Sequence, residues 1–527
     1  MMNGHMDRRP SLSEEELSLF DEKTLSDLEN DLRDAETERR FPSWQWTDTI
    51  KPHIRTFRAS SWRAILCRST FALLPSFIQN RFRTEHKPDK LFPTSYLDGM
   101  RGLAALFVFF CHYSYSCFVI TEGYGHGGPG ENNNILQLPF IRLFYSGPPM
   151  VCLFFVISGY ALSLKPLKQM RSHQWDALNT TLTSSIFRRG IRLFLPTTIS
   201  TFMVVLLLRM GFYESTRAFA SNKQLLRNIV EYHPERLPTF TAQFNDWIWR
   251  VYEFVHVWGW ESFGGSTGYD VHLWTIPVEF RCSMVLFLVL SGLARLRVWI
   301  RLTSLFFIAW FTYRNGRWEM LLFLAGMFLA ELDLIRLASR RPTLTNTPLH
   351  SSCSNCKESN SQRKKIMKGF WIALGIVALY LMSQPDDHFS STPGWITLST
   401  LIPTFFTDKY RYYQCLGSIL LVLATNHSKF LQKPFNHPII QYLGKISYAL
   451  YLVHGPVLHV IGYRIEPWAW GVTGSESRGE YVRGFLLGAV FIVPTTVWVA
   501  DLFWRWVDGP TVRFARWVEG RCNVPAE

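Results

Sequence analysis

Apolar residues occur in long runs along the chain, separated by polar and charged segments. The runs are about 16–24 residues long, which is typical of helices that cross a membrane, and they are too numerous for one soluble core. Ten candidate spans follow from this pattern, at residues 97–120, 143–164, 190–209, 279–296, 298–313, 317–336, 368–384, 409–425, 444–463 and 482–506. The pattern therefore predicts an all-α integral membrane protein with about ten transmembrane helices.

The basic residues show which ends of these spans face the cytosol. Lys and Arg gather before the first span, in every second loop and after the last span. This alternation is typical of a positive-inside bias and predicts that both termini are cytosolic. The net charge of +14 is explained by these loops, so no nucleic-acid partner is expected.

Composition divides the chain into three regions. Residues 1–94 form a polar cytosolic tail, and its segment near 62–82 alternates apolar and basic residues. We interpret that segment as an amphipathic stretch on the membrane surface, with a buried soluble helix as the alternative. Residues 95–515 form the multi-pass membrane domain, and 516–527 a second cytosolic tail. The outer loop at 210–278 is rich in Trp and Tyr, which is typical of an interfacial helix, although it could also cover a substrate pocket.

The first span carries three ionisable residues, which are costly inside a bilayer and tend to mark a site. Arg101 and His112 are eleven residues apart, close to three helical turns, so they share a face at a separation of roughly 16 Å along the axis. Asp98 lies one turn before Arg101 on the same stripe. The topology places Arg101 near the cytosolic mouth and His112 beyond the midplane.

Further polar residues lie on other spans. Arg189 and Arg192 share a face at the cytosolic start of the third span, where they suit a phosphate or serve as ordinary flanking charges. Glu279, near the outer end of the fourth span, lies at a depth similar to that of His112. A His and a carboxylate at one depth suit proton transfer, and a structural ion pair of Glu279 with Arg281 or Arg101 is the alternative.

The ninth span contains SYALYLVHGPV, in which Gly455-Pro456 predicts a kink. His454 in this segment is either a core histidine or a site residue. A lone C-x-x-C pair, Cys353 and Cys356, lacks the further ligands that zinc requires, so no metal site is predicted.

Together these segments resemble the membrane-bound acyltransferase 3 family. LDGMRGLAALFVFFCHY resembles the opening helix of the family, which has an Arg, ten intervening residues and a His. LFFVISGYALS, RRGIR, LWTIPVEF and LGKISYALYLVHGPVL resemble later family segments in the same order, over roughly residues 95–515. The charged N-terminal extension and the aromatic outer loop look like the fungal branch.

The resemblance implies transfer of an acyl group, commonly acetyl, from acyl-CoA to a hydroxyl of a metabolite, glycan or lipid. The implied catalytic residues are His112 as general base or acyl carrier, Glu279 to orient it, and Arg101. The implied donor-binding residues are Arg189 and Arg192, and the supporting residues are Asp98, Tyr448, Tyr451 and His454. The thioester is already activated, so no bound cofactor is expected. Apart from the resemblance, an ion- or proton-coupled transporter or a channel would explain the same intramembrane Arg, His and Glu. An endomembrane and the plasma membrane both remain open.

Overall fold

The computed structural model describes residues 70–82, 91–128, 131–259, 266–339 and 354–523, without the side chains of 80 and 354–361. The chain divides into two units, Met1–Ser95 and Tyr96–Glu527. The described part of the first unit includes helix α4 (Ser76–Phe82), which lies within the segment predicted to be amphipathic. The rest of that segment up to residue 69, the side chain of Cys356 and all of Cys353 lie outside the described part.

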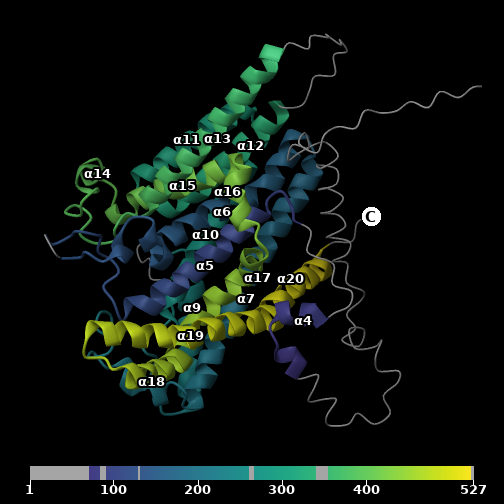
Figure 1. Cartoon of the computed structure of the whole chain (residues 1–527). Coiled ribbons are helices and arrows are strands. Elements are labelled where there is room, and N and C mark those ends of the chain that lie inside the picture. The colour runs from purple at the N-terminus through teal and green to yellow at the C-terminus, as the bar shows by residue number, and fades with distance from the viewer. Residues whose placement is uncertain (1–69, 83–90, 129–130, 260–265, 340–353, 524–527) are drawn as a thin grey trace, which may run out of the picture. The chain divides into compact units, whose positions relative to one another are not determined.

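The second unit is helical, and among the described residues it contains only one isolated β-bridge, between Thr267 and Asp270. Its longer helices are α5 (Ser95–Tyr115), α6 (Gly147–Arg171), α7 (Trp175–Arg209), α9 (Phe240–Val255), α10 (Thr275–Leu293), α11 (Val298–Arg314), α12 (Trp318–Ser339), α13 (Ser354–Met382), α15 (Tyr412–His427), α17 (Pro438–Val457), α18 (Tyr463–Thr473), α19 (Arg478–Phe503) and α20 (Gly509–Cys522) (Figure 1). The shorter ones are η1 (Ile135–Gln137), η2 (Ile141–Tyr145), η3 (Glu214–Thr216), α8 (Arg217–Ala220), η4 (Val271–Trp274), α14 (Ile396–Thr400), η5 (Lys409–Arg411), α16 (Lys429–Phe435), and the π-helical turns η6 (Leu458–Gly462) and η7 (Trp504–Asp508).

Every predicted span falls largely on a helix, but the boundaries differ. The first ends five residues early, at Tyr115, and the third begins fifteen residues early, at Trp175. Within the described residues, five helical segments are long and apolar enough to cross a membrane: Gly147–Arg171, Trp175–Arg209, Val271–Leu293, Gln362–Met382 and Arg478–Cys522. The last of these runs through residues predicted to form the C-terminal tail.

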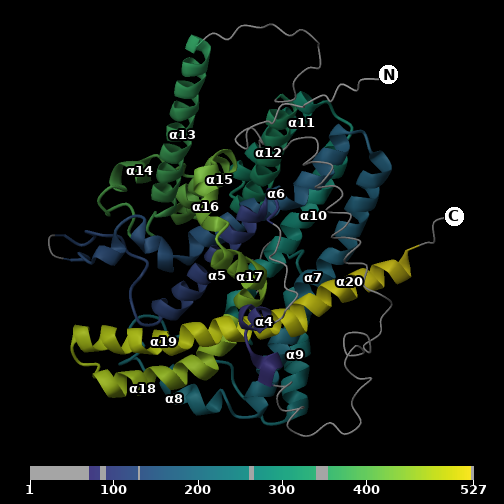
Figure 2. The same cartoon turned by 45° about the vertical axis from the view of Figure 1, so that its right-hand side comes forward.

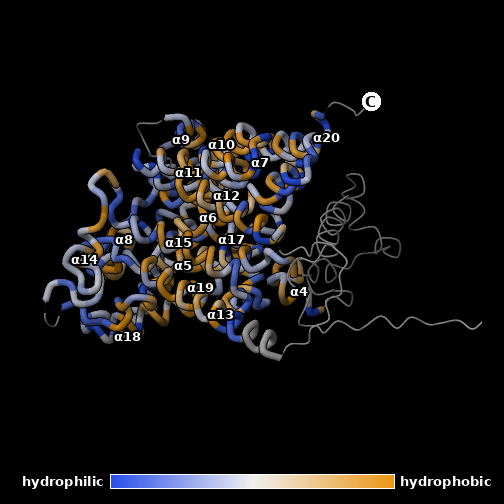
Figure 3. The backbone as a smooth tube through the Cα atoms, turned by 90° about the horizontal axis from the view of Figure 1, so that it is seen from above, coloured by the Kyte–Doolittle hydropathy of each residue, from blue (hydrophilic) through white to orange (hydrophobic). Residues whose placement is uncertain are grey.

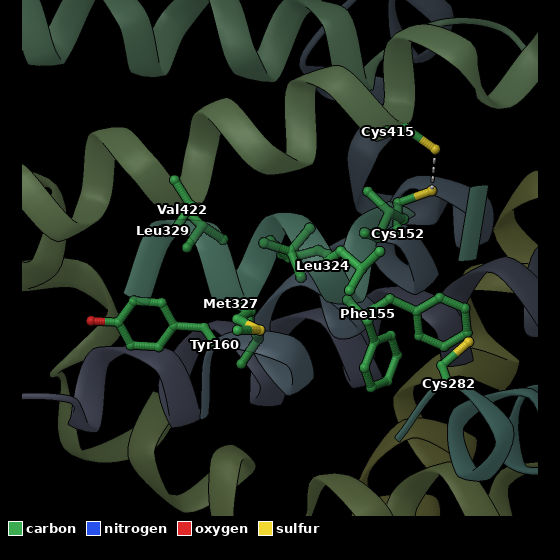
Figure 4. Close-up of a cluster of buried hydrophobic side chains, with 14 of the residues drawn as sticks. Cys152, Phe155, Tyr160, Cys282, Leu324, Met327, Leu329, Cys415 and Val422 are labelled. Carbon is green, nitrogen blue, oxygen red and sulfur yellow. Dashed lines mark hydrogen bonds between the residues drawn. The ribbon is translucent and has the colours of Figure 1, made fainter. Parts of the chain in front are cut away.

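The apolar core lies between α6, α10, α12 and α15. Figure 4 shows Cys152 and Phe155 of α6 facing Leu324 and Met327 of α12, all of them buried. The thiol sulfurs of Cys152 and Cys415 are 3.8 Å apart at the edge of this cluster. Figure 3 shows the apolar stretches of α6, α12 and α15 together in the middle of the view. This core holds the helices that carry the polar site residues.

Helices α5 and α17 cross at two glycines. A Cβ atom on Gly102 would lie 2.3 Å from the backbone nitrogen of Gly444, and one on Gly444 would lie 2.5 Å from the carbonyl oxygen of Asp98. Only residues without a side chain allow this approach, which is a common way to pack helices in membranes. The crossing fixes α5 beside α17.

The predicted kink at Gly455-Pro456 takes the form of a π-helical turn. Helix α17 ends at Val457, and the turn η6 continues it into α18. π-turns are frequent at functional sites, and this one presents His459 inward as a buried residue. Helix α18 then turns back, and Figure 2 shows it beside α19.

Candidate active site

Three imidazoles from three separate elements meet at the C-terminal end of α5. His112 lies in the last turn of α5, His272 in η4 and His454 near the end of α17. The ring centroid of His112 is 4.1 Å from that of His272 and 5.2 Å from that of His454, and the remaining pair is 4.8 Å apart. Two of the predicted site residues, His112 and His454, are therefore brought together.

His272 is held between two buried carboxylates. Its Nδ1 is 2.7 Å from Oδ1 of Asp270, and its Nε2 is 2.5 Å from Oε1 of Glu231. Ionised carboxylates only accept hydrogen bonds, so both ring nitrogens donate and His272 is an imidazolium. Burial disfavours ionisation of Glu231, but the charge of His272 and the hydrogen bonds from His272 and His459 outweigh it and hold the pKa of Glu231 well below its ordinary value.

The local chain explains how His272 is oriented. Asp270 is the N-cap of η4, and its Oδ1 also accepts a hydrogen bond from the backbone N–H of His272 at 3.0 Å. On the other side, Gly455 of α17 leaves room for the pair. A Cβ atom there would lie 2.6 Å from Nδ1 of His272 and 2.9 Å from Oδ1 of Asp270. The glycine in the H-G-P segment thus lets α17 lie against the His272–Asp270 pair.

The two predicted supporting tyrosines attach α17 to its neighbours. The hydroxyl of Tyr451 donates to the carbonyl oxygen of His272 and accepts a hydrogen bond from Thr275 at 2.7 Å. The hydroxyl of Tyr448 donates to the carbonyl oxygen of Leu193 at 2.6 Å. Tyr451 therefore holds α17 against η4, and Tyr448 holds it against α7.

Two imidazole nitrogens in the site are buried with no hydrogen-bond partner among the described residues: Nδ1 of His112 and Nε2 of His454. Nδ1 of His454 lies 2.8 Å from the carbonyl oxygen of Tyr451 and must donate to it, so Nε2 carries a lone pair. Such a nitrogen can accept a proton. The three imidazoles are close enough to surround a metal ion, but both nitrogens of His272 already bind carboxylates, so it has no lone pair to offer.

Glu279 does not orient His112 as the sequence led us to expect. Its Oε1 accepts hydrogen bonds from Nη2 of Arg189 at 2.7 Å and from the hydroxyl of Ser158 at 3.3 Å. Arg189 also donates from Nε to the hydroxyl of Ser283 at 3.0 Å. Glu279 lies seven residues beyond His272, which is about two helical turns or roughly 10 Å along the chain. It therefore belongs with the arginines.

The remaining predicted arginines gather around one carboxylate. Arg101 and Arg192 both act electrostatically on Asp508, and Arg192 also interacts with Arg188 and Arg189. Arg192 is solvent-exposed, and Arg101 is half-exposed in an ion pair with Asp98 at 3.5 Å. Three of the four arginines here form ion pairs, since Arg188 also pairs with Glu519 at 3.1 Å. Arg192 makes no ion pair within 4 Å among the described residues, so its guanidinium group suits an anionic ligand.

The sequence analysis did not single out His272 or the two carboxylates that bind it, Asp270 and Glu231. His272 opens the HLWTIPVEF segment, and its position beside that motif was the available signal. Asp270 has the weaker signal of an N-cap residue two positions earlier. Glu231 lies 41 residues before His272 in an irregular loop, where no local pattern marks it.

The chain belongs to the acyltransferase 3 family, whose acyltransferase domain model matches residues 94–505. It is 32% identical over 471 residues to the O-acetyltransferase PaAT-1 of Phomopsis amygdali, covering 85% of this chain and 88% of that protein. It is also 27% identical to acyltransferase R4 of Phoma sp. (strain ATCC 20986 / MF5453), covering 81% of this chain and 96% of the relative. Acyltransferase clz18 of Cochliobolus lunatus is 26% identical, with 79% and 94% covered. No solved structure matches the chain.

These similarities confirm that the protein is an enzyme that transfers acyl groups. The family and the five apolar helical segments together indicate a membrane protein.

Proposed function

We propose that the enzyme transfers an acetyl group from acetyl-CoA to a hydroxyl group of a small molecule, secondary metabolite or sugar. The observation that carries this proposal is the pair of free imidazole nitrogens, on His112 and His454, beside the His272 imidazolium and its two carboxylates. The printed name of the relative from Phomopsis amygdali, an O-acetyltransferase, supports both the acetyl group and the oxygen acceptor.

In this mechanism His112 is the general base. It removes the proton of the acceptor hydroxyl as the oxygen attacks the thioester carbonyl. A C–O bond forms, the C–S bond breaks, and the proton passes from His112 to the leaving CoA thiolate. His454 offers a second lone pair in the same site. The carboxylate of Glu231 favours the imidazolium that forms on His112, and it acts against the charge of the nearer His272.

The donor lies at the other end of α5 in this proposal. Arg101 is about three turns of α5 from His112. Arg192 of α7 acts on the same carboxylate, Asp508, as Arg101 does, and Arg189 lies one turn before Arg192. Guanidinium groups bind phosphates through charge and geometry. CoA carries phosphates at the end remote from its thiol, so it would extend along α5 from the arginines toward the imidazoles. Glu279 then positions Arg189 and Asp98 positions Arg101. The activated thioester requires no metal or other bound cofactor.

We also propose the multi-pass arrangement predicted from the sequence, with ten spans and both termini in the cytosol. The alternation of basic loops supports it, and all ten spans fall on helices, five of them in segments that meet the length and composition of a membrane helix. This arrangement brings cytosolic CoA to the arginine end of α5.

The test is an assay of purified protein or membranes with labelled acetyl-CoA and a panel of acceptors containing a sugar, a sterol and an alcohol-bearing secondary metabolite. We expect label in one acceptor, and a loss of at least a hundredfold in kcat for His112→Ala. His256→Ala, which changes an exposed histidine at the end of α9, is the matched control and should keep full activity. Transfer that persists in His112→Ala would exclude His112 as the base. Ion-coupled uptake without transfer would instead favour a transporter.

A further inference from the structure

The hydrogen-bond chain that holds His272 continues beyond Glu231 through two more histidines. The second carboxylate oxygen of Glu231 lies 3.0 Å from Nε2 of His459 in η6. Nδ1 of His459 lies 2.8 Å from Nδ1 of His233, and Nε2 of His233 lies 2.8 Å from the carbonyl oxygen of Tyr213. The side chains of Glu231, His233 and His459 are all buried.

The number of protons on this histidine pair follows from its partners. The carboxylate of Glu231 and the carbonyl oxygen of Tyr213 can only accept, so His459 Nε2 and His233 Nε2 must each carry a hydrogen. The nitrogen–nitrogen contact between the rings needs one more hydrogen, on either Nδ1. Two neutral imidazoles carry two ring hydrogens in total, and this pair requires three. The pair therefore holds one extra proton and a charge of +1.

Of the two rings, His459 is the one whose Nε2 contacts the carboxylate of Glu231, so the extra proton is assigned to His459, where that negative charge stabilises it. His459 then donates from both nitrogens, to Glu231 and to His233, and neutral His233 donates to Tyr213. This assignment satisfies every nitrogen of the pair.

The extra proton changes the charge beside the acyl-transfer site. Asp270 and Glu231 contribute −2, and His272 contributes +1. With the proton on His459 the network is neutral, and without it the network carries −1. We propose that His233 and His459 are positioning residues whose shared proton sets the charge next to His112 and His454, and so tunes these two imidazoles as bases. The inference rests on the proposed function, in which those imidazoles accept a proton.

Few other charges act on the pair. Arg217 donates to the carbonyl oxygen of His233 at 3.5 Å, but it forms an ion pair with Glu214 at 2.6 Å that offsets its charge. The rings of Tyr213 and Tyr463 pack against both histidines. Among the described residues, Glu231 is the carboxylate in hydrogen-bond contact with the pair.

The test is the pH profile of kcat/KM for acetyl transfer to the best acceptor of the panel. In His459→Gln the amide can still donate to Glu231 but carries no charge, so the network stays at −1. The imidazolium forms of His112 and His454 are then stabilised, so a higher pH is needed to deprotonate them. The acidic limb of the kcat/KM profile should therefore move to higher pH. One charge at roughly 10 Å with an effective dielectric constant of about 20 corresponds to a shift of about one pH unit.

Two companion variants separate charge from structure. His459→Arg keeps a positive charge beside Glu231 and should retain the wild-type limb. His256→Gln is the matched control and should also retain it. An unshifted limb in His459→Gln, or a shift in His459→Arg, would overturn the proposal. If His459→Gln fails to fold, the comparison of His459→Arg with wild type decides alone.

A second readout does not depend on acyl transfer. Histidines of the unfolded chain release their protons near pH 6.5, whereas the hydrogen-bond chain of the folded state requires three ring hydrogens on the pair. Wild-type stability should therefore fall more steeply than that of His459→Gln as the pH rises above about 6.5. If Tm depends on pH equally in wild type and His459→Gln, the histidine pair holds no extra proton and the proposal is wrong. If the two proteins differ in this way but no acetyl transfer is found, the extra proton is supported and the proposed function is rejected.

Discussion

Glu466 of α18 is a buried carboxyl group in apolar surroundings. Its residue is 3% exposed, and it shares a cavity with His112 that has room for about one water molecule, about 10 Å³. The ionisable groups on which it acts are Tyr113, Cys117, Tyr463 and Tyr481, which are neutral at pH 7. Burial without a compensating charge raises the pKa of Glu466 to about 8.

This pKa predicts how stability depends on pH. Between the ordinary value of 4.5 and about 8 the folded state binds more protons at Glu466 than the unfolded state does. Stability from this group is therefore fully present below pH 4.5 and is lost as the pH rises to about 8. A shift of this size corresponds to about 5 kcal/mol at most, since one pKa unit is about 1.4 kcal/mol.

Replacing Glu466 with Gln removes the titration and keeps the shape. We expect Glu466→Gln to match wild type near pH 5 and to exceed its Tm by roughly 5 °C at pH 8.5, given the unfolding entropy of a chain of this size. The assay is thermal unfolding in detergent, followed by tryptophan fluorescence at pH steps and one scan rate. Glu476→Gln changes an exposed carboxylate and should follow wild type. Parallel Tm curves for Glu466→Gln and wild type would refute the reasoning.

Three further predictions concern the arginines and the helix crossing. Arg192→Ala should raise the KM for acetyl-CoA about tenfold, through loss of a charge-assisted phosphate contact, with little change in acceptor KM; an unchanged donor KM would make Arg192 an ordinary flanking charge. Arg189→Ala and Glu279→Gln should be non-additive in a double-mutant cycle of unfolding, with a coupling of about 1–2 kcal/mol, because the pair is largely buried; additive effects would contradict the ion pair. Gly102→Ala should lower the unfolding free energy by about 3 kcal/mol, because the new Cβ atom would clash with the α17 backbone. Gly292→Ala is the control, because a Cβ atom there meets nothing within 4 Å, and this variant should be neutral or slightly stabilising. Equal stability of the two alanine variants in chemical or thermal unfolding would contradict the close crossing.

The helical architecture was predictable because it depends on local composition. Apolar runs of membrane-spanning length must form helices to satisfy their backbone groups in lipid, and each predicted span falls largely on a helix. The boundaries were less predictable. Helix α7 begins at Trp175 in a polar stretch, where continued hydrogen bonding and tertiary contacts extend a helix beyond its apolar part.

The candidate site was predictable only in part. Arg101 and His112 lie on one helix, so their spacing determines both the shared face and the separation, and α5 carries both. The motif order also indicated His454, which the structure brings to His112. The partner of Glu279 was not predictable, because topology gives the depth of a side chain and not the neighbour toward which it points.

The sequence by itself determined the helices, the apolar core and the stripe of ionisable residues on the first span, because helix period and hydrophobicity are local properties of the chain. Only the tertiary structure decided which carboxylates meet the imidazoles. Glu231 reaches His272 across 41 residues of sequence, and His233 reaches His459 across 226. Such contacts depend on how helices and loops pack around one another, and no local pattern encodes a hydrogen bond between residues so far apart.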